Sequence, residues 1–90
     1  MDEIKALQAE SKGMRAQELL QNEILQEVFQ TLKNDYIEKW KTTSARDSDA
    51  RERLWQAVNI VDLVKDHIRY IVDKGKLSTK ELAKIKYPKP

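Results

Sequence analysis

The pattern of hydrophobic and polar positions predicts two long amphipathic helices joined by a polar loop. Between residues 23 and 41, apolar side chains recur every three or four residues, the spacing of one helix face; they are Leu25, Phe29, Leu32, Tyr36 and Trp40. Between 49 and 73, alternating steps of three and four make an a/d heptad seam of Leu54, Ala57, Val61, Val64, Ile68 and Ile71. Residues 41–48 lack this periodicity and are rich in turn formers, so they form the loop.

Local signals predict where the helices begin. The apolar phase shifts near Asn22, which indicates a break with Asn22 as the cap of the following helix. Gly13 interrupts the segment before it, which has little to bury. Asp49 and Glu52 have the spacing of a capping box at the start of the next helix. We therefore expect a short N-terminal helix ahead of the two long ones.

The C-terminal region is predicted to form a separate short helix. Gly75 suits the left-handed position that closes a helix, so the long seam helix should end near 73. Residues 78–81 (STKE) are a second capping box. They predict a short helix from about 79 to 86.

These elements predict an all-α fold. The hairpin would pair residues 23–41 with 49–73 in antiparallel fashion, and the short N- and C-terminal helices would pack across its ends. A chain of 90 residues buries a small core, so we expect oligomerisation to complete it. The expected organisation is a frayed N-terminal segment (1–13), a helical hairpin domain (14–73) and a Lys-rich C-terminal helix and tail (74–90).

Composition narrows the class of protein. Charged residues make up 36% of the chain and hydrophobic ones 40%, a balance typical of a protein that folds in water. The chain has no cysteine, which excludes disulfides and sulfur-ligated metals. Its first residues lack the features of a secretory signal, and no apolar run approaches membrane-spanning length.

Candidate chemistry is sparse, and we expect no enzymatic activity, metal or cofactor. His67 is the only histidine, and it is expected to fill the edge of the seam rather than act as a base. No Glu-x-x-His pair of the di-metal helix bundles occurs. Glycine-rich phosphate loops and the Gly-x-Ser-x-Gly turn of hydrolases are missing as well.

Apolar residues on the far side of the seam helix are a first functional signal. Leu63 and Tyr70 lie there, with Trp55 towards one side, where a lone helix pair would face water. They predict an interface with another copy or another protein. The alternative is that the N-terminal helices of the same chain cover them.

The basic tail is a second signal. Residues 1–73 carry 11 Lys and Arg against 14 Asp and Glu (net −3), whereas residues 74–90 carry 6 Lys against one Glu (net +5). These lysines could contact nucleic-acid phosphates; they are Lys74, Lys76, Lys80, Lys84, Lys86 and Lys89. Without arginine forks such a contact would read little base sequence. The alternative is a solvated tail.

Several segments resemble a group of small, mostly uncharacterised helical proteins of tailed bacteriophages and prophages. The matching pattern runs from AQELLQN (16–22) through Phe29, Leu32 and Trp40 to RERLW (51–55), and then from His67 to GKL (75–77). Such proteins are usually encoded among virion-structure and DNA-packaging genes. The resemblance implies a role in the particle or in packaging, in the cytoplasm of the infected host or in the virion.

Two functions follow as hypotheses. The first is a non-enzymatic structural or adaptor protein that joins copies of itself or binds another phage protein through its apolar faces. The second is a DNA-packaging factor, similar in size and helicity to small terminase subunits, that contacts DNA phosphates through the tail. We expect no membrane or small-molecule partner.

Overall fold

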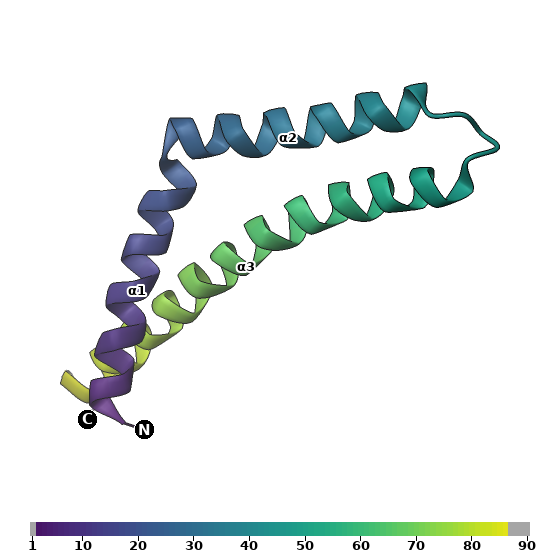
Figure 1. Cartoon of the computed structure of the whole chain (residues 1–90). Coiled ribbons are helices and arrows are strands. Elements are labelled where there is room, and N and C mark those ends of the chain that lie inside the picture. Colours follow the sequence, from purple (N-terminus) through teal and green to yellow (C-terminus); the bar gives the residue numbers. More distant parts are fainter. Residues whose placement is uncertain (1, 87–90) are drawn as a thin grey trace. The chain divides into compact units, whose positions relative to one another are not determined.

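The described part of the chain forms three α-helices (Figure 1). The structure is a computed structural model that describes residues 2–86, apart from the side chain of Lys86. Helix α1 spans Glu3–Gln21, α2 spans Glu23–Thr42 and α3 spans Ser48–Lys86. No strand occurs within the described residues. The all-α class predicted from the sequence is confirmed.

The helices form two separate packing units, both of which use α3. Unit 1 combines α1 with α3 from His67 onward. Unit 2 combines α2 with the part of α3 that ends at Asp66. Each unit therefore consists of one helix packed against part of α3.

The break between α1 and α2 lies at Asn22, as the sequence predicts. Asn22 has an extended backbone (φ −69°, ψ 118°) and caps α2. Its Oδ1 accepts a hydrogen bond from the backbone N–H of Leu25 at 2.9 Å. This bond satisfies a donor that has no partner within the helix.

The connection between α2 and α3 is shorter than expected, and a different residue caps α3. The helices leave only residues 43–47 between them. Asp47 accepts from the backbone N–H of Ala50 through Oδ1 (3.2 Å) and from that of Arg51 through its carbonyl oxygen (3.1 Å). The predicted capping box at Asp49 and Glu52 is therefore wrong, because α3 already begins at Ser48 and Asp47, two residues before Asp49, supplies the capping oxygen.

Neither glycine ends or interrupts a helix. Gly13 lies inside α1 and Gly75 lies inside α3, and neither has a positive φ. The predicted stop near 73, the second capping box at 78–81 and the separate helix of about 79–86 are therefore wrong. The N-terminal segment is helical from Glu3, and α1 continues through Gly13 without the predicted interruption.

The glycines serve instead as the point of closest approach in unit 1. A Cβ atom built on Gly13 would lie 2.8 Å from Gly75 Cα, and one on Gly75 would lie 2.8 Å from Gly13 Cα. Real Cβ atoms do not approach backbone this closely. The two helices can cross here only because both residues lack a side chain.

Other buried residues, most of them small, extend this close contact along unit 1. On α1 the buried residues are Ala6, Gly13 and Ala16; on α3 they are Val72, Gly75, Ser78 and Leu82. Small side chains at a helix crossing allow a short distance between the axes. Beside them, the Thr79 hydroxyl donates to Glu10 Oε2 at 2.7 Å, which adds a polar link between α1 and α3.

Unit 2 has a thin core. Along α2, the predicted stripe residues Leu25, Phe29, Tyr36 and Trp40 are half-buried, whereas Leu32 is exposed. Lys33 Nζ contacts both carboxylate oxygens of Asp62 at 3.1 and 3.2 Å, with each side chain partly exposed.

The contact stripe of α3 is rotated from the predicted seam. Leu54, Ala57, Val61, Ile68 and Ile71 are half-buried as seam residues. Val64, placed at the seam's centre by the sequence, is 47% exposed, whereas Val58 is only 5% exposed. Burial in unit 2 centres on Leu54, Val58 and Val61. The contact stripe therefore steps from Leu54 by four residues and then by three, whereas the predicted seam steps by three and then by four.

Candidate functional site

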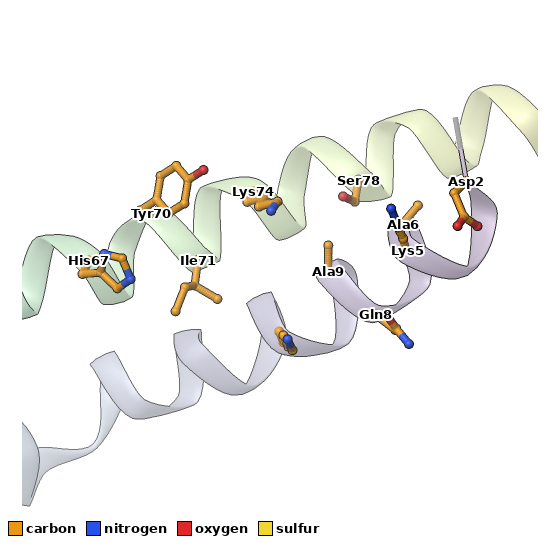
Figure 2. A pocket seen from close by; sticks show the side chains of 11 residues that line it. Asp2, Lys5, Ala6, Gln8, Ala9, His67, Tyr70, Ile71, Lys74 and Ser78 are labelled. Carbon is orange, nitrogen blue, oxygen red and sulfur yellow. The ribbon is translucent and has the colours of Figure 1, made fainter.

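Unit 1 contains a groove lined by basic, aromatic and apolar residues. It has a volume of about 640 Å³ and lies along α1 and the second part of α3 (Figure 2). We call it the basic groove and define it by its lining residues: Asp2, Lys5, Ala6, Gln8, Ala9, Lys12, His67, Tyr70, Ile71, Lys74 and Ser78.

Three lysines give the groove its charge. Lys5 and Lys12 lie seven residues apart on α1, and so on the same side of the helix, about 10.5 Å apart along its axis. Lys74 comes from α3. Within the described part of the chain, none of the three forms an ion pair with a carboxylate. Asp2, the one acidic residue of the lining, accepts from the backbone N–H of Ile4 at 3.0 Å.

The rest of the groove combines an apolar floor with aromatic rings. Figure 2 shows Ala9 on α1 and Ile71 on α3 facing the space between the two ribbons. The His67 and Tyr70 rings are 6.1 Å apart between centroids and are tilted by 32°. A groove with unpaired ammonium groups, an apolar floor and an exposed ring can bind an anionic ligand that also has a flat face.

Of the predicted tail lysines that the structure describes, only Lys74 belongs to the basic groove. Lys74 lines the basic groove. Lys76 follows it by two residues, or about 200° around the helix, and it does not line the groove; neither do Lys80 and Lys84, which are also exposed. The side chain of Lys86 and all of Lys89 lie outside the described residues.

The three residues of the predicted interface are all more than half exposed. Trp55 and Leu63 lie in unit 2, and Tyr70 lies in unit 1, where it lines the basic groove. Trp55 also borders a shallow cavity with Trp40 and Arg51. Their role in an interface stays a prediction.

Sequence reasoning missed two lysines of the groove. Lys5 and Lys12 were not singled out, because the N-terminal segment has few large apolar residues to define a buried face. The signal was present in a different form: Ala6, Ala9, Gly13 and Ala16 recur at steps of three, four and three. Such a stripe of small residues predicts a close helix contact, with its flanking residues brought beside the partner helix.

Comparisons with protein-family models, with curated proteins and with solved structures found no match for this chain. The resemblance to phage proteins therefore stays a prediction. Among the described residues, no helix combines the length and the apolar character needed to cross a membrane.

Proposed function

We propose that this chain is a non-enzymatic structural or adaptor protein that works by self-association through unit 2. In this proposal α2 and the first part of α3 form an antiparallel hairpin. A second copy of the chain covers its open apolar face. The resemblance to tailed-phage proteins would give such an adaptor a place in the virion or in its assembly in the host cytoplasm.

Contacts within unit 2 support the antiparallel arrangement. Lys33, near the middle of α2, contacts Asp62. Trp40, further along α2, meets Arg51, which is earlier in α3: the guanidinium lies 4.2 Å from the centre of the ring. Because later residues of α2 meet earlier residues of α3, the two helices run in opposite directions.

One face of this hairpin carries a row of exposed apolar residues from both helices. On α2, Ile24, Val28 and Leu32 are exposed and recur every four residues, so they form one stripe. Each directly precedes a half-buried residue in the sequence. The exposed stripe therefore lies about 100° back from the contact side of the helix.

The matching stripe on α3 consists of Ile60 and Val64, which are also exposed. They directly precede Val61 and Lys65, both half-buried. In two antiparallel helices that pack side by side, the residues that come one position before the contact residues lie on the same face of the pair in both helices. The stripes of α2 and α3 therefore make one apolar face, whose residues are Ile24, Val28, Leu32, Ile60 and Val64.

The single observation that carries the proposal is this face together with the thin core beneath it. Val58 is the one apolar residue of unit 2 that is buried, and no described large side chain in either unit is fully buried. Two helices that bury so little need a further layer to be stable. Two hairpins joined by their apolar faces would supply it, as in a four-helix bundle with two-fold symmetry.

Placing one charge on the face tests the proposal. Val64→Asp should lower the native mass towards that of a single 10.6 kDa chain, because the interface would otherwise bury an unpaired carboxylate. Asn59→Asp is the matched control: it adds the same charge to an exposed position of α3 that lies well away from the face. It should keep the wild-type mass.

The melting temperature gives a second readout in case Val64→Asp fails to fold. If folding and self-association are linked, the wild-type melting temperature rises with protein concentration. Wild-type mass in Val64→Asp would contradict the assignment of the face. A melting temperature independent of concentration, with a single-chain mass, would contradict self-association itself.

A further inference from the structure

The lysines that line the basic groove of unit 1 outnumber its acidic residues, and no carboxylate of the described residues pairs with them. Lys5, Lys12 and Lys74 line one groove, and within the described residues none of them is paired with a carboxylate. Three like charges around one concave surface repel one another and raise the local positive potential. A bound anion relieves this repulsion.

The spacing of the lysines fits a chain of anions better than a single one. Lys5 and Lys12 are separated by two helical turns, about 10.5 Å. This length corresponds to about three nucleotides at the 3.4 Å rise of a stacked strand. Lys74 approaches the groove from the other helix, so that a strand lying along the groove would have ammonium groups on both sides.

The aromatic content of the groove points to a ligand with bases. Tyr70 is 59% exposed, and its ring is 6.1 Å from that of His67. An exposed ring beside a basic groove is the arrangement by which proteins bind single strands, with a base stacked on the ring and lysines beside the phosphates. The floor at Ala9 and Ile71 offers no donor or acceptor from a side chain. The groove therefore favours stacking over recognition of particular base edges.

We propose that the basic groove binds single-stranded nucleic acid, with its phosphates on Lys5, Lys12 and Lys74 and one base stacked on Tyr70. This site is independent of the apolar face of unit 2. It also differs from the Lys-rich tail, of which it uses Lys74 alone.

The test is a fluorescence-anisotropy titration of the full chain with a labelled oligothymidylate of about 12 nucleotides, within the range bound by single-strand sites. The groove variant is Lys5→Gln/Lys12→Gln/Lys74→Gln. Its control is Lys76→Gln/Lys80→Gln/Lys84→Gln, which removes the same charge from exposed lysines outside the groove. Both are first checked for wild-type helix content and native mass.

Salt dependence separates the groove from the tail. Each phosphate contact with a single strand contributes about 0.7 to the slope of log affinity against log salt, so three contacts contribute about 2. The groove variant should lose at least tenfold in affinity at about 0.1 M salt and about 2 from the slope. The control should stay within about threefold of wild type, since it keeps every groove contact. Equal losses in both variants, a loss confined to the control, or no binding by wild type would each overturn the proposal.

Tyr70 distinguishes a nucleic acid from another polyphosphate. Tyr70→Leu should weaken oligothymidylate binding at least fivefold with an unchanged salt slope, while Tyr70→Phe keeps wild-type affinity because its ring still stacks. Inorganic polyphosphate should bind Tyr70→Leu and wild type equally. If Tyr70→Leu binds the oligonucleotide as tightly as wild type, the groove is a phosphate site without base stacking, and the proposal is overturned.

Discussion

Replacing Gly75 by alanine tests the close helix crossing on which unit 1 depends. The new Cβ would lie 2.8 Å from Gly13 Cα and 3.0 Å from the carbonyl oxygen of Ala9. Both are backbone atoms of α1, so neither can rotate away as a flexible side chain would. The two helices must separate or shift along each other to admit the methyl group.

Two opposing effects set the size of the change in stability. Alanine is favoured over glycine inside a helix by about 1 kcal/mol. Overpacking a close contact costs about 1–3 kcal/mol, and here it also loosens the contacts of neighbouring buried residues such as Ala16 and Val72. The packing cost should exceed the helix gain, so we expect Gly75→Ala to destabilise the protein by about 1 kcal/mol. In a chain of this size that lowers the melting temperature by about 4–8 °C.

The assay is thermal unfolding followed by far-ultraviolet circular dichroism at one fixed protein concentration. Ser11→Ala is the control, because Ser11 is exposed on α1 and its replacement gains helix propensity, a few tenths of a kcal/mol, with no new contact. The double variant Gly13→Ala/Gly75→Ala should cost less than the sum of the single ones, since one separation accommodates both methyl groups. If Gly75→Ala raised the melting temperature as Ser11→Ala does, the crossing could not be as close as described.

Three further substitutions test other contacts. Val58→Asp would bury an unpaired carboxylate at a 5% exposed position and should cost several kcal/mol, seen as loss of the helical circular-dichroism signal; an unchanged melting temperature would refute the rotated contact stripe. Asn22→Ala should cost about 1 kcal/mol in urea unfolding because α2 loses its cap, whereas Asn22→Ser should retain most of it. Arg51 donates to the carbonyl oxygens of Trp40 (3.2 Å) and Thr43 (3.1 Å), so Arg51→Lys, which lacks the planar fork, should lose about 1 kcal/mol; equal unfolding midpoints for variant and wild type would show that these bonds add nothing.

The helical class and the break at Asn22 could be predicted because both have strong local signals. Apolar spacing of three and four residues specifies helices whatever they pack against. The cap at Asn22 depends on an oxygen that reaches a backbone N–H three residues away, which is a local interaction. The structure contains both, with the Asn22 bond to Leu25 at 2.9 Å.

The glycines were misread because their role depends on a partner helix distant in the sequence. Glycine has a low helix propensity and is common where helices end, so local reasoning placed a stop at Gly75. In the structure, the residue that packs against Gly75 is Gly13, which lies in the first helix of the chain. The value of a missing side chain becomes apparent only when that second helix is present.

The contact stripe of α3 and the basic groove also depend on tertiary contacts that the sequence pattern does not determine. Steps of three and four from Leu54 fit either Ala57 and Val64 or Val58 and Lys65. Only the packed structure shows that Val58 is more buried than Ala57, and that Lys65 is half-buried whereas Val64 is exposed. Similarly, the sequence grouped lysines by their closeness along the chain. The groove brings Lys74 together with lysines of α1 instead, a grouping that tertiary contact alone determines.

The central claim is that the hairpin of unit 2 is completed by a second copy of the chain, and the native mass tests it most directly. Sedimentation equilibrium of the wild-type protein over a wide range of concentrations should give a mass of at least twice 10.6 kDa, falling towards the single-chain value only as the protein is diluted and loses helix content. A mass of 10.6 kDa at every concentration, with full helix content, would contradict the account.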